Sequence, residues 1–506
     1  MFAKLTSAIV VGIDAHTVQI EVDSLRGLPA INIIGLAQGA AKESKDRAIH
    51  ALLNSGIKIP PKKIIINLAP ADLKKSGSGF DLPIALGLSI IAGIEIDTKG
   101  YIFAAELSLD GNLRGISGIF PIAVLARENN LCLIVSKDNK DEAAISGAKT
   151  VGFESLSDVI NFLQSKKEIP HKAIDINSLY SNHNKYDIDF ADVKGQLKVK
   201  RAAQIAASGF HNILFIGPPG VGKSMIAKRI TTIMPKMNEN EILETTKIYS
   251  VIGLLNKDNP VVIKRPFRAP HHTASDVSLI GGGINATPGE ITLANNGILF
   301  LDEFPEFKRN VLEVLRQPME DGSITVSRAS AKITYPANFL LIAAMNPCPC
   351  GYYGSKKKEC SCTIAQIKKY RQKISGPILD RIDLQISVPE IDYEEMTSDL
   401  YPQVSSKELQ NTVEKAADIQ KTRFKNSKSV NYNSQMSEKD LKQYCKLDEE
   451  SSKILQLTMD KFAFSARSYS KILKISRTIA DIDNQDRIKA KHIKEAISYR
   501  ILDWDV

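Results

Sequence analysis

A phosphate-binding loop stands near the middle of this 506-residue chain. The run Gly217-Pro218-Pro219-Gly220-Val221-Gly222-Lys223-Ser224 fits the pattern G-x-x-x-x-G-K-[ST], whose glycines let backbone amides approach a polyphosphate closely. We expect Lys223 to neutralise the β- and γ-phosphates and the Ser224 hydroxyl to coordinate Mg²⁺. The alternative is a glycine-rich turn without a ligand, but the segments around the run favour the phosphate loop.

Two carboxylates follow a second apolar run at residues 298–301. Asp302 is placed to hold the same Mg²⁺, mostly through water, because this ion sheds its hydration reluctantly. Glu303 is the candidate that polarises the attacking water. Together with the phosphate loop, this pair predicts the binding and hydrolysis of a nucleoside triphosphate.

Three further polar residues stand where such a site needs them. Asn346 ends the apolar run 340–345 and could reach the γ-phosphate or its attacking water. Arg381 lies in an otherwise apolar and acidic stretch, and Arg467 opens a helix-like stretch near the C-terminus. The planar guanidinium suits a finger that spreads positive charge over phosphate oxygens. Taken singly, each arginine fits a surface ion pair equally well.

Four of the six cysteines are clustered, as Cys348-x-Cys350 and Cys360-x-Cys362. Four thiolates at this separation could enclose a structural, tetrahedral Zn²⁺. The C-x-C spacing is less common than C-x-x-C, so unligated thiols, a disulfide and an iron–sulfur cluster are alternatives. Lysines at 356–358 and basic residues within 368–373 make this excursion basic, which fits either a DNA contact or a solvated surface.

Short apolar runs supply the strands that must position these groups. Residues 213–216 precede the phosphate loop as a buried parallel strand would, and the runs before Asp302 and Asn346 have the same character. In the N-terminal third, β-rich runs alternate with amphipathic helical patterns such as 40–53, and from about residue 391 the pattern is helical. The expected parts are an α/β domain at 1–165, a linker at 166–190, an α/β core at 191–390 and a helical domain at 391–506.

Composition narrows the class of protein. Hydrophobic residues make up 43% and charged residues 24%, as in globular proteins, and no apolar run reaches the roughly 18 residues that span a bilayer. The N-terminus opens no signal peptide, and clustered cysteines fit a reducing compartment, so we expect a cytoplasmic protein without a membrane partner. The net charge of +9 permits a polyanionic partner without proving one.

The order of these features resembles an AAA+ ATPase and, more narrowly, the magnesium-chelatase-like family typified by the bacterial ComM and YifB proteins. The resemblance covers nearly the whole chain. It rests on residues 265–275 (RPFRAPHHTAS), 346–351 (NPCPCG), 374–384 (ISGPILDRIDL) and 477–481 (RTIAD). It implies a homo-oligomeric ring, usually hexameric, with ATP and Mg²⁺ between subunits. Asn346 is then sensor 1, Arg381 a finger acting on the neighbour's ATP, and Arg467 sensor 2 in a helical lid domain.

The same resemblance assigns the segments around the core. Residues 192–196 become the entry segment beside the adenine, and 265–295 become a helix-2 insert in which His271 and His272 are structural rather than metal ligands. As neighbours in a strand or loop, the two histidines are expected to point apart. Residues 324–333 correspond to a pre-sensor hairpin that directs Arg328 and Lys332 toward the ring pore, where positive charge suits a phosphate backbone.

The N-terminal domain resembles the fold of Lon protease domains. Peptide cleavage there requires a Ser–Lys dyad, and Gly79 and Phe120 occupy the two positions. Neither residue can serve as nucleophile or base, although Ser76, Ser78, Lys74 and Lys75 lie nearby in sequence. We therefore expect a binding or ring-assembling role for this domain.

These features lead to two hypotheses about function. The first is an ATP-dependent ring motor, a helicase or translocase, that acts on single-stranded or branched DNA and promotes branch migration during homologous recombination. The resemblance implies a role in natural transformation. The second is a chelatase-like or chaperone-like motor that remodels a protein partner. ATP-dependent proteolysis is disfavoured by the missing dyad.

Overall fold

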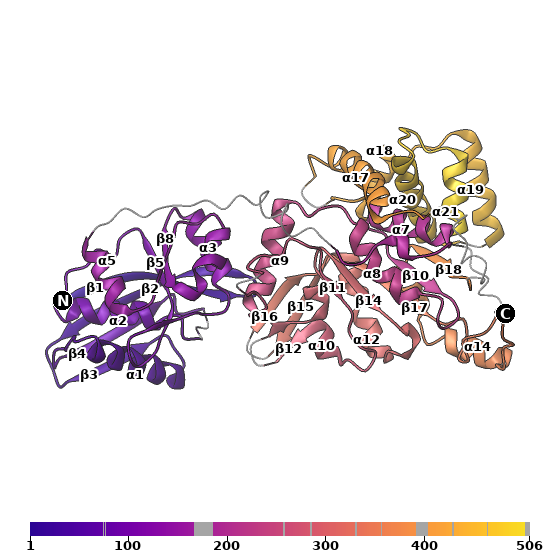
Figure 1. Ribbon diagram of the computed structural model, residues 1–506. Helices are drawn as coiled ribbons and strands as arrows, with labels where there is room; N and C mark the ends of the chain where they lie inside the picture. Colours follow the sequence, from indigo (N-terminus) through magenta and orange to yellow (C-terminus); the bar gives the residue numbers. More distant parts are fainter. Residues whose placement is uncertain are drawn as a thin grey trace. The chain divides into compact units, whose positions relative to one another are not determined.

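The computed structural model describes residues 1–73, 75, 77–165, 186–256, 259–283, 286–328, 331–355, 357–390, 403–427, 430–462 and 464–500. The chain divides into two compact units (Figure 1). Unit 1 comprises Met1–His183 and Glu239–Ile263, and unit 2 comprises Asn184–Asn238 and Lys264–Val506. Most of the expected linker, at 166–185, lies outside the described residues, as do Lys74, Ser76, the hairpin tip and the first residues of the expected helical domain.

Unit 1 is an α/β fold built on two sheets. A four-stranded sheet of order β1-β2-β4-β3 lies beside a parallel three-stranded sheet of order β5-β8-β9, and β6 pairs with β7. The strands are β1 Phe2–Val11, β2 Asp14–Leu25, β3 Ala30–Ile34, β4 Lys63–Ala69, β5 Tyr101–Ala104, β6 Glu106–Leu107, β7 Leu113–Arg114, β8 Cys132–Ser136 and β9 Thr150–Phe153. The helices are α1 Gln38–Asn54, α2 Asp81–Ile91, α3 Ile119–Glu128, α4 Lys140–Ile145 and α5 Leu156–Ser165.

One helix of unit 1 comes from the middle of the sequence. Helix α9 (Glu239–Val251) packs against α3, and the backbone N–H of Gly118 donates to the carbonyl of Ser250 at 2.9 Å. The chain therefore leaves unit 2 after Asn238, contributes α9 to unit 1, and returns at Lys264.

Unit 2 is organised around a parallel five-stranded sheet of order β11-β14-β17-β10-β18. The strands are β10 Ile213–Ile216, β11 Phe267–Arg268, β14 Ile298–Leu301, β17 Leu340–Met345 and β18 Leu384–Ser387. The residues of β10, β14 and β17 are nearly all buried, as expected for apolar runs covered by helices on both faces. The sequence correctly located all three strands.

The register of this sheet brings the polar residues that follow β10, β14 and β17 to one edge. Ile216 of β10 pairs with Met345 of β17, and Leu301 of β14 pairs with Ala343 of β17. Because the strands are parallel, the residues that follow them emerge at the same carboxyl edge, where ligands bind in open α/β sheets. Helix α7 (Leu197–Gly209) precedes β10, and helix α8 (Lys223–Ile233) begins at the lysine of the phosphate loop.

Shorter elements surround the sheet. Two antiparallel ribbons are formed by β12 Gly281–Gly282 with β13 Thr287–Pro288, and by β15 Ser323–Arg328 with β16 Ala331–Pro336. The second ribbon is the hairpin expected at 324–333. The helices here are α10 Asp276–Ile280, α11 Glu290–Leu293, α12 Arg309–Val314, α13 Arg316–Asp321, α14 Ile364–Arg371 and α15 Gly376–Leu379.

The C-terminal part of unit 2 is helical. It contains α17 Ser406–Arg423, α18 Glu438–Tyr444, α19 Glu449–Phe462, α20 Ala466–Ile482 and α21 Ala490–Ser498. Figure 1 shows α17 and α20 beside α7, and the three helices pack on one another. A largely buried ion pair joins these parts, because Lys471 of α20 lies 2.7 Å from Asp383, next to β18, and the two side chains are only 16% and 10% exposed. Burial alone would favour a neutral carboxyl, but Lys471 and His211 hold the pKa of Asp383 well below its usual range.

The expected fold class is confirmed: a parallel phosphate-loop sheet with helices, a preceding α/β unit and a helical C-terminal region. Among the residues that the structure describes, no helix combines the length and apolar character needed to cross a membrane.

Candidate functional site

The phosphate loop runs from the end of β10 into α8. Gly220 and Gly222 have φ values of +83° and +88°, which glycine adopts without strain. A side chain at Gly217 would meet the carbonyl oxygen of Val388 at 2.3 Å, so the close approach of the residue after β18 also requires glycine there. Gln196, from the expected entry segment, donates to the Val221 carbonyl at 3.2 Å and so contacts the loop from α7.

Lys223 is folded back into its own loop. Its ammonium donates to the carbonyls of Gly217 (2.7 Å) and Pro218 (2.8 Å) and to Oδ1 of Asn346 (3.1 Å). The residue is only 8% exposed, and burial lowers the pKa of its ammonium to about 8, with Asp302 opposing the shift. The lysine and the strand-end amide that the sequence singled out are therefore direct partners.

Ser224 and Asp302 also meet. The Ser224 hydroxyl donates to Oδ2 of Asp302 at 2.5 Å, and the other carboxylate oxygen accepts the backbone N–H of Glu303 at 2.9 Å. A hydroxyl and a carboxylate are oxygen donors of the kind that Mg²⁺ prefers. These two side chains are suited to hold Mg²⁺ beside a nucleotide, where the ion would neutralise phosphate charge.

Glu303 has a partner that the sequence did not reveal. Its backbone lies in the left-handed region, with φ +51°, and Oε2 lies 2.9 Å from Nδ1 of His272. The expectation that His271 and His272 point apart was wrong, because their ring centroids are 4.1 Å apart. Both follow the end of β11 in a turn, where the alternation of a strand does not apply. His272 is thus placed to hold the carboxylate expected to polarise the attacking water.

Arg381 and Arg467 converge on one carboxylate. Nη2 of Arg381 lies 2.5 Å, and Nη2 of Arg467 lies 3.2 Å, from the same Oε1 atom of Glu320 on α13. Hydrogen bonding from Arg381 holds the pKa of Glu320 below its usual value. The two arginines are 86 positions apart in the chain (467 − 381), and nothing in the sequence signalled that Glu320 would join them.

The hairpin carries one exposed basic side chain that can be described. Its strands pair from Ser323 with Pro336 to Arg328 with Ala331, and Lys332, opposite Ser327, is exposed. The Arg328 backbone lies in β15, but its side chain lies outside the described part of the structure. The hairpin base is anchored, because the buried Tyr335 hydroxyl donates to the Ala286 carbonyl at 2.7 Å.

The four clustered cysteines are brought together as a metal-sized group. The Sγ atoms of Cys348, Cys350 and Cys360 are 3.3–3.6 Å apart, and the ligand atoms of all four, including Cys362, lie within 4.8 Å of one another. Tetrahedral Zn²⁺ with Zn–S bonds of about 2.3 Å needs sulfurs roughly 3.8 Å apart, so the set fits such an ion. All four are free thiols, so the disulfide alternative is not seen.

The loop that carries this cysteine cluster lies next to the phosphate loop. Gly351 has φ +87°, and a side chain there would meet Cδ of Pro219 in the phosphate loop at 2.8 Å and Cγ of Asn346 at 3.8 Å. Part of the surrounding basic charge is engaged locally, since Lys358 lies over the Tyr352 ring and Arg371 over the Tyr353 ring. A metal at the cysteines would thus stiffen a loop that packs on the phosphate loop.

Unit 1 holds no described nucleophile–base pair at the positions expected for a protease. Phe120 is fully buried on α3, and Gly79 packs against Ile116. Lys75 is buried and donates to the backbone carbonyls of Pro70 and Leu73. Phe120 and Lys75 thus have the surroundings of a structural core.

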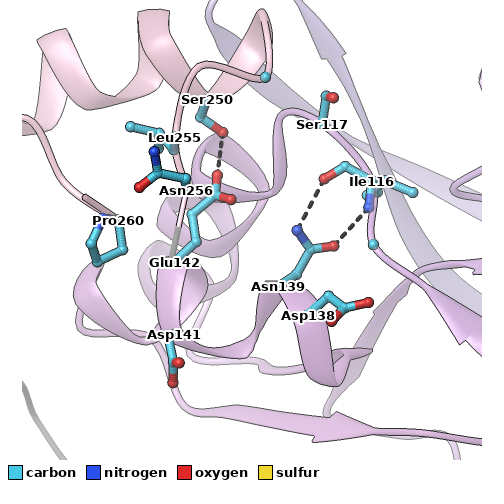
Figure 2. A pocket seen from close by; sticks show the side chains of 12 residues that line it. Ile116, Ser117, Asp138, Asn139, Asp141, Glu142, Ser250, Leu255, Asn256 and Pro260 are labelled. Atoms are coloured by element: carbon cyan, nitrogen blue, oxygen red, sulfur yellow. Dashed lines mark hydrogen bonds between the residues drawn. The ribbon is translucent and has the colours of Figure 1, made fainter. Parts of the chain in front are cut away.

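A polar cavity of about 270 Å³ lies in unit 1 where α9 meets α3 and α4 (Figure 2). In it, the Ser250 hydroxyl donates to Glu142 at 2.6 Å, and Asn139 pairs with both backbone groups of Ile116. Burial raises the pKa of Glu142. The Ser250–Glu142 hydrogen bond joins α9 to α4 within unit 1.

The chain was compared with known proteins. Family models match it in three consecutive parts: subunit ChlI of Mg-chelatase at residues 20–139, magnesium chelatase subunit ChlI at 189–396, and its C-terminal part at 403–500. Competence protein ComM of Haemophilus influenzae is 41% identical over 497 residues, which are 97% of this chain and 96% of that protein. The uncharacterized protein YifB of Escherichia coli is 41% identical over 498 residues, with the same coverage.

A more distant relative is DNA replication licensing factor mcm-6 of Caenorhabditis briggsae, which is 23% identical over 350 residues, or 67% of this chain and 39% of that protein. The family matches imply an ATPase that uses Mg²⁺, in agreement with the loop and carboxylates described above. Because the 41% identity extends over nearly its full length, the chain belongs to the magnesium-chelatase-like AAA+ family that includes ComM and YifB.

Proposed function

We propose that this protein is an ATP-dependent ring motor that translocates on single-stranded or branched DNA and promotes branch migration during homologous recombination, in natural transformation. Members of the family usually form oligomeric rings, and a hexamer is the expected size. The observation that carries the proposal is the hairpin β15–β16, which presents exposed Lys332 from the ATPase unit. The names of ComM and mcm-6 refer to competence and to DNA replication, which also supports DNA as the substrate.

The ATP site would be completed between subunits. Within one chain, the phosphate loop binds the nucleotide, Ser224 and Asp302 hold Mg²⁺, and Glu303 polarises the water. Asn346, already bonded to Lys223, acts as sensor 1. Arg381 and Arg467 supply the finger and sensor 2, and their shared position on Glu320 supports a common task.

Zinc is proposed as a structural ion at the four cysteines. Its task would be to fix the loop that contacts Pro219 and Asn346, with the basic residues of α14 as a second DNA contact. Four thiolates leave no open coordination position, so no catalytic role is assigned to the ion.

The alternative is a chelatase-like or chaperone-like motor that remodels a protein partner. The family models, named for a magnesium-chelatase subunit, favour this second candidate. The two candidates differ in what stimulates hydrolysis, namely DNA for the first and a protein for the second.

The test is the ATPase rate of the full-length protein without DNA and with single-stranded, duplex and branched DNA, together with strand displacement from a branched substrate. Lys332→Glu should abolish the DNA stimulation, because it reverses charge on the hairpin. Lys439 on α18 is also exposed, so Lys439→Glu is the matched control and should keep the DNA stimulation. Absence of both stimulation and displacement in the unsubstituted protein would reject the DNA motor.

A further inference from the structure

Glu320 occupies an unusual position between two cationic side chains that the ATPase is expected to use. Arg381 follows α15, Arg467 lies in α20, and both donate to Oε1 of Glu320. Two guanidinium groups that contact the same oxygen atom would repel each other if the carboxylate were absent. Glu320 is therefore the group that keeps both arginines in one place.

In this arrangement the Arg381 side chain is largely shielded from solvent. Its side chain is only 9% exposed, whereas that of Arg467 is 59% exposed. Nη1 of Arg381 donates to the Pro377 carbonyl at 2.7 Å, and its buried Nε has no hydrogen-bond partner in the described structure. A finger that acts on a neighbour's phosphate must be reachable from outside its own chain. The observed contacts instead engage the Arg381 guanidinium with groups of its own chain.

The carboxylate that holds Arg381 is joined directly to the hairpin. Glu320 lies in the last turn of α13, and β15 begins three positions later, at Ser323. Gly322, between them, has φ +61° and open space around its Cα, so it can serve as a hinge. Its carbonyl accepts the N–H of Ala337 at 2.8 Å, which closes the base of the hairpin. A displacement of the hairpin therefore acts on the segment that carries Glu320.

We propose that Glu320 is a positioning residue that latches Arg381 and Arg467 in the resting subunit, and that displacement of the β15–β16 hairpin by DNA releases them to act on the neighbouring subunit's ATP. This inference rests on the proposed function for its trigger. The latch itself is a property of the three side chains. Hydrolysis is slow while Glu320 neutralises Arg381. It becomes fast when DNA occupies the β15–β16 hairpin.

The experiment compares ATPase rates with and without single-stranded DNA for the full-length protein and for Glu320→Gln. Gln keeps the shape but removes the charge that retains the arginines. An ion pair of this kind shifts an equilibrium by up to about fivefold. The DNA-free rate should therefore rise, by up to about fivefold, and the DNA-stimulated rate should stay within about twofold.

Glu313→Gln is the matched control, because Glu313 pairs with Arg316 at 2.7 Å in the adjoining helices. It should leave the ratio of stimulated to basal rate unchanged. Adding Glu320→Gln to Lys332→Glu should restore fast hydrolysis without DNA, since release no longer needs the hairpin. Thermal unfolding of each variant verifies that the fold is kept.

A DNA-free rate for Glu320→Gln that is unchanged or lower, in a protein that remains folded, overturns the latch. If DNA fails to stimulate the unsubstituted protein but Glu320→Gln still raises its basal rate, the latch stands and the DNA motor fails. If DNA stimulates the unsubstituted protein but Glu320→Gln leaves the ratio unchanged, the DNA motor stands and the latch fails.

Discussion

The buried ammonium of Lys223 should make nucleotide binding depend on pH in an accessible range. Burial brings its pKa to about 8 in the nucleotide-free protein. A bound triphosphate favours the charged form and so raises this pKa. By linkage, the protein must take up a proton to bind nucleotide once the pH exceeds about 8, and affinity falls as the pH rises.

The magnitude follows from the fraction of Lys223 that is already charged. With a pKa of about 8, that fraction is roughly 76% at pH 7.5 and roughly 9% at pH 9. The dissociation constant should therefore increase about eightfold between these pH values, or about 1.2 kcal/mol, provided that the pKa in the complex lies above about 10.

The assay is an equilibrium titration with a non-hydrolysable ATP analogue and saturating Mg²⁺, repeated from pH 7.5 to 9. Lys223→Arg is the control, because its guanidinium stays charged throughout. Whatever its absolute affinity, its curve should be flat across this range. A flat curve for the unsubstituted protein, parallel to that of Lys223→Arg, would refute the assignment of a titrating lysine at the phosphates.

Other substitutions address the remaining parts of the site. Glu303→Gln should keep nucleotide affinity within about twofold and lower kcat by on the order of a hundredfold, because the water is no longer polarised; a loss below tenfold would contradict this role. Arg381→Ala should abolish hydrolysis, and mixing it with Glu303→Gln should restore part of the activity at interfaces that join an intact arginine to an intact glutamate. No recovery in verified mixed rings would argue against action between subunits. Metal analysis should find about one zinc per chain, which Cys360→Ser loses and Cys132→Ser, in unit 1, retains; a metal-free unsubstituted protein with four reactive thiols would reject the zinc site.

Local sequence patterns were sufficient for much of the core. The apolar runs at 213–216, 298–301 and 340–345 became β10, β14 and β17, because residues buried on both faces of a parallel sheet must all be apolar. The phosphate loop could be identified directly from the sequence, because the glycines and the lysine of the motif stand within eight consecutive residues. The alternating run at 324–333 became a hairpin for a similarly local reason.

Contacts between distant segments could not be read in this way. The grouping of α9 with unit 1 depends on its packing against α3, although its sequence neighbours belong to unit 2. The contact between His272 and Glu303 depends on a turn after β11 whose conformation has no simple sequence signature. Histidine and glutamate are both common on protein surfaces, so their identities alone could not predict this contact.

The sequence by itself thus determined which groups are available for chemistry: a glycine-rich loop with its lysine and serine, and two carboxylates directly after a buried strand. The tertiary structure decided how these side chains are buried and which groups they contact. It buried Lys223 and lowered its pKa, set His272 against Glu303, and joined Arg381 and Arg467 through Glu320. The physical reason is that charge and burial act through space, over distances that only the packing of the chain defines.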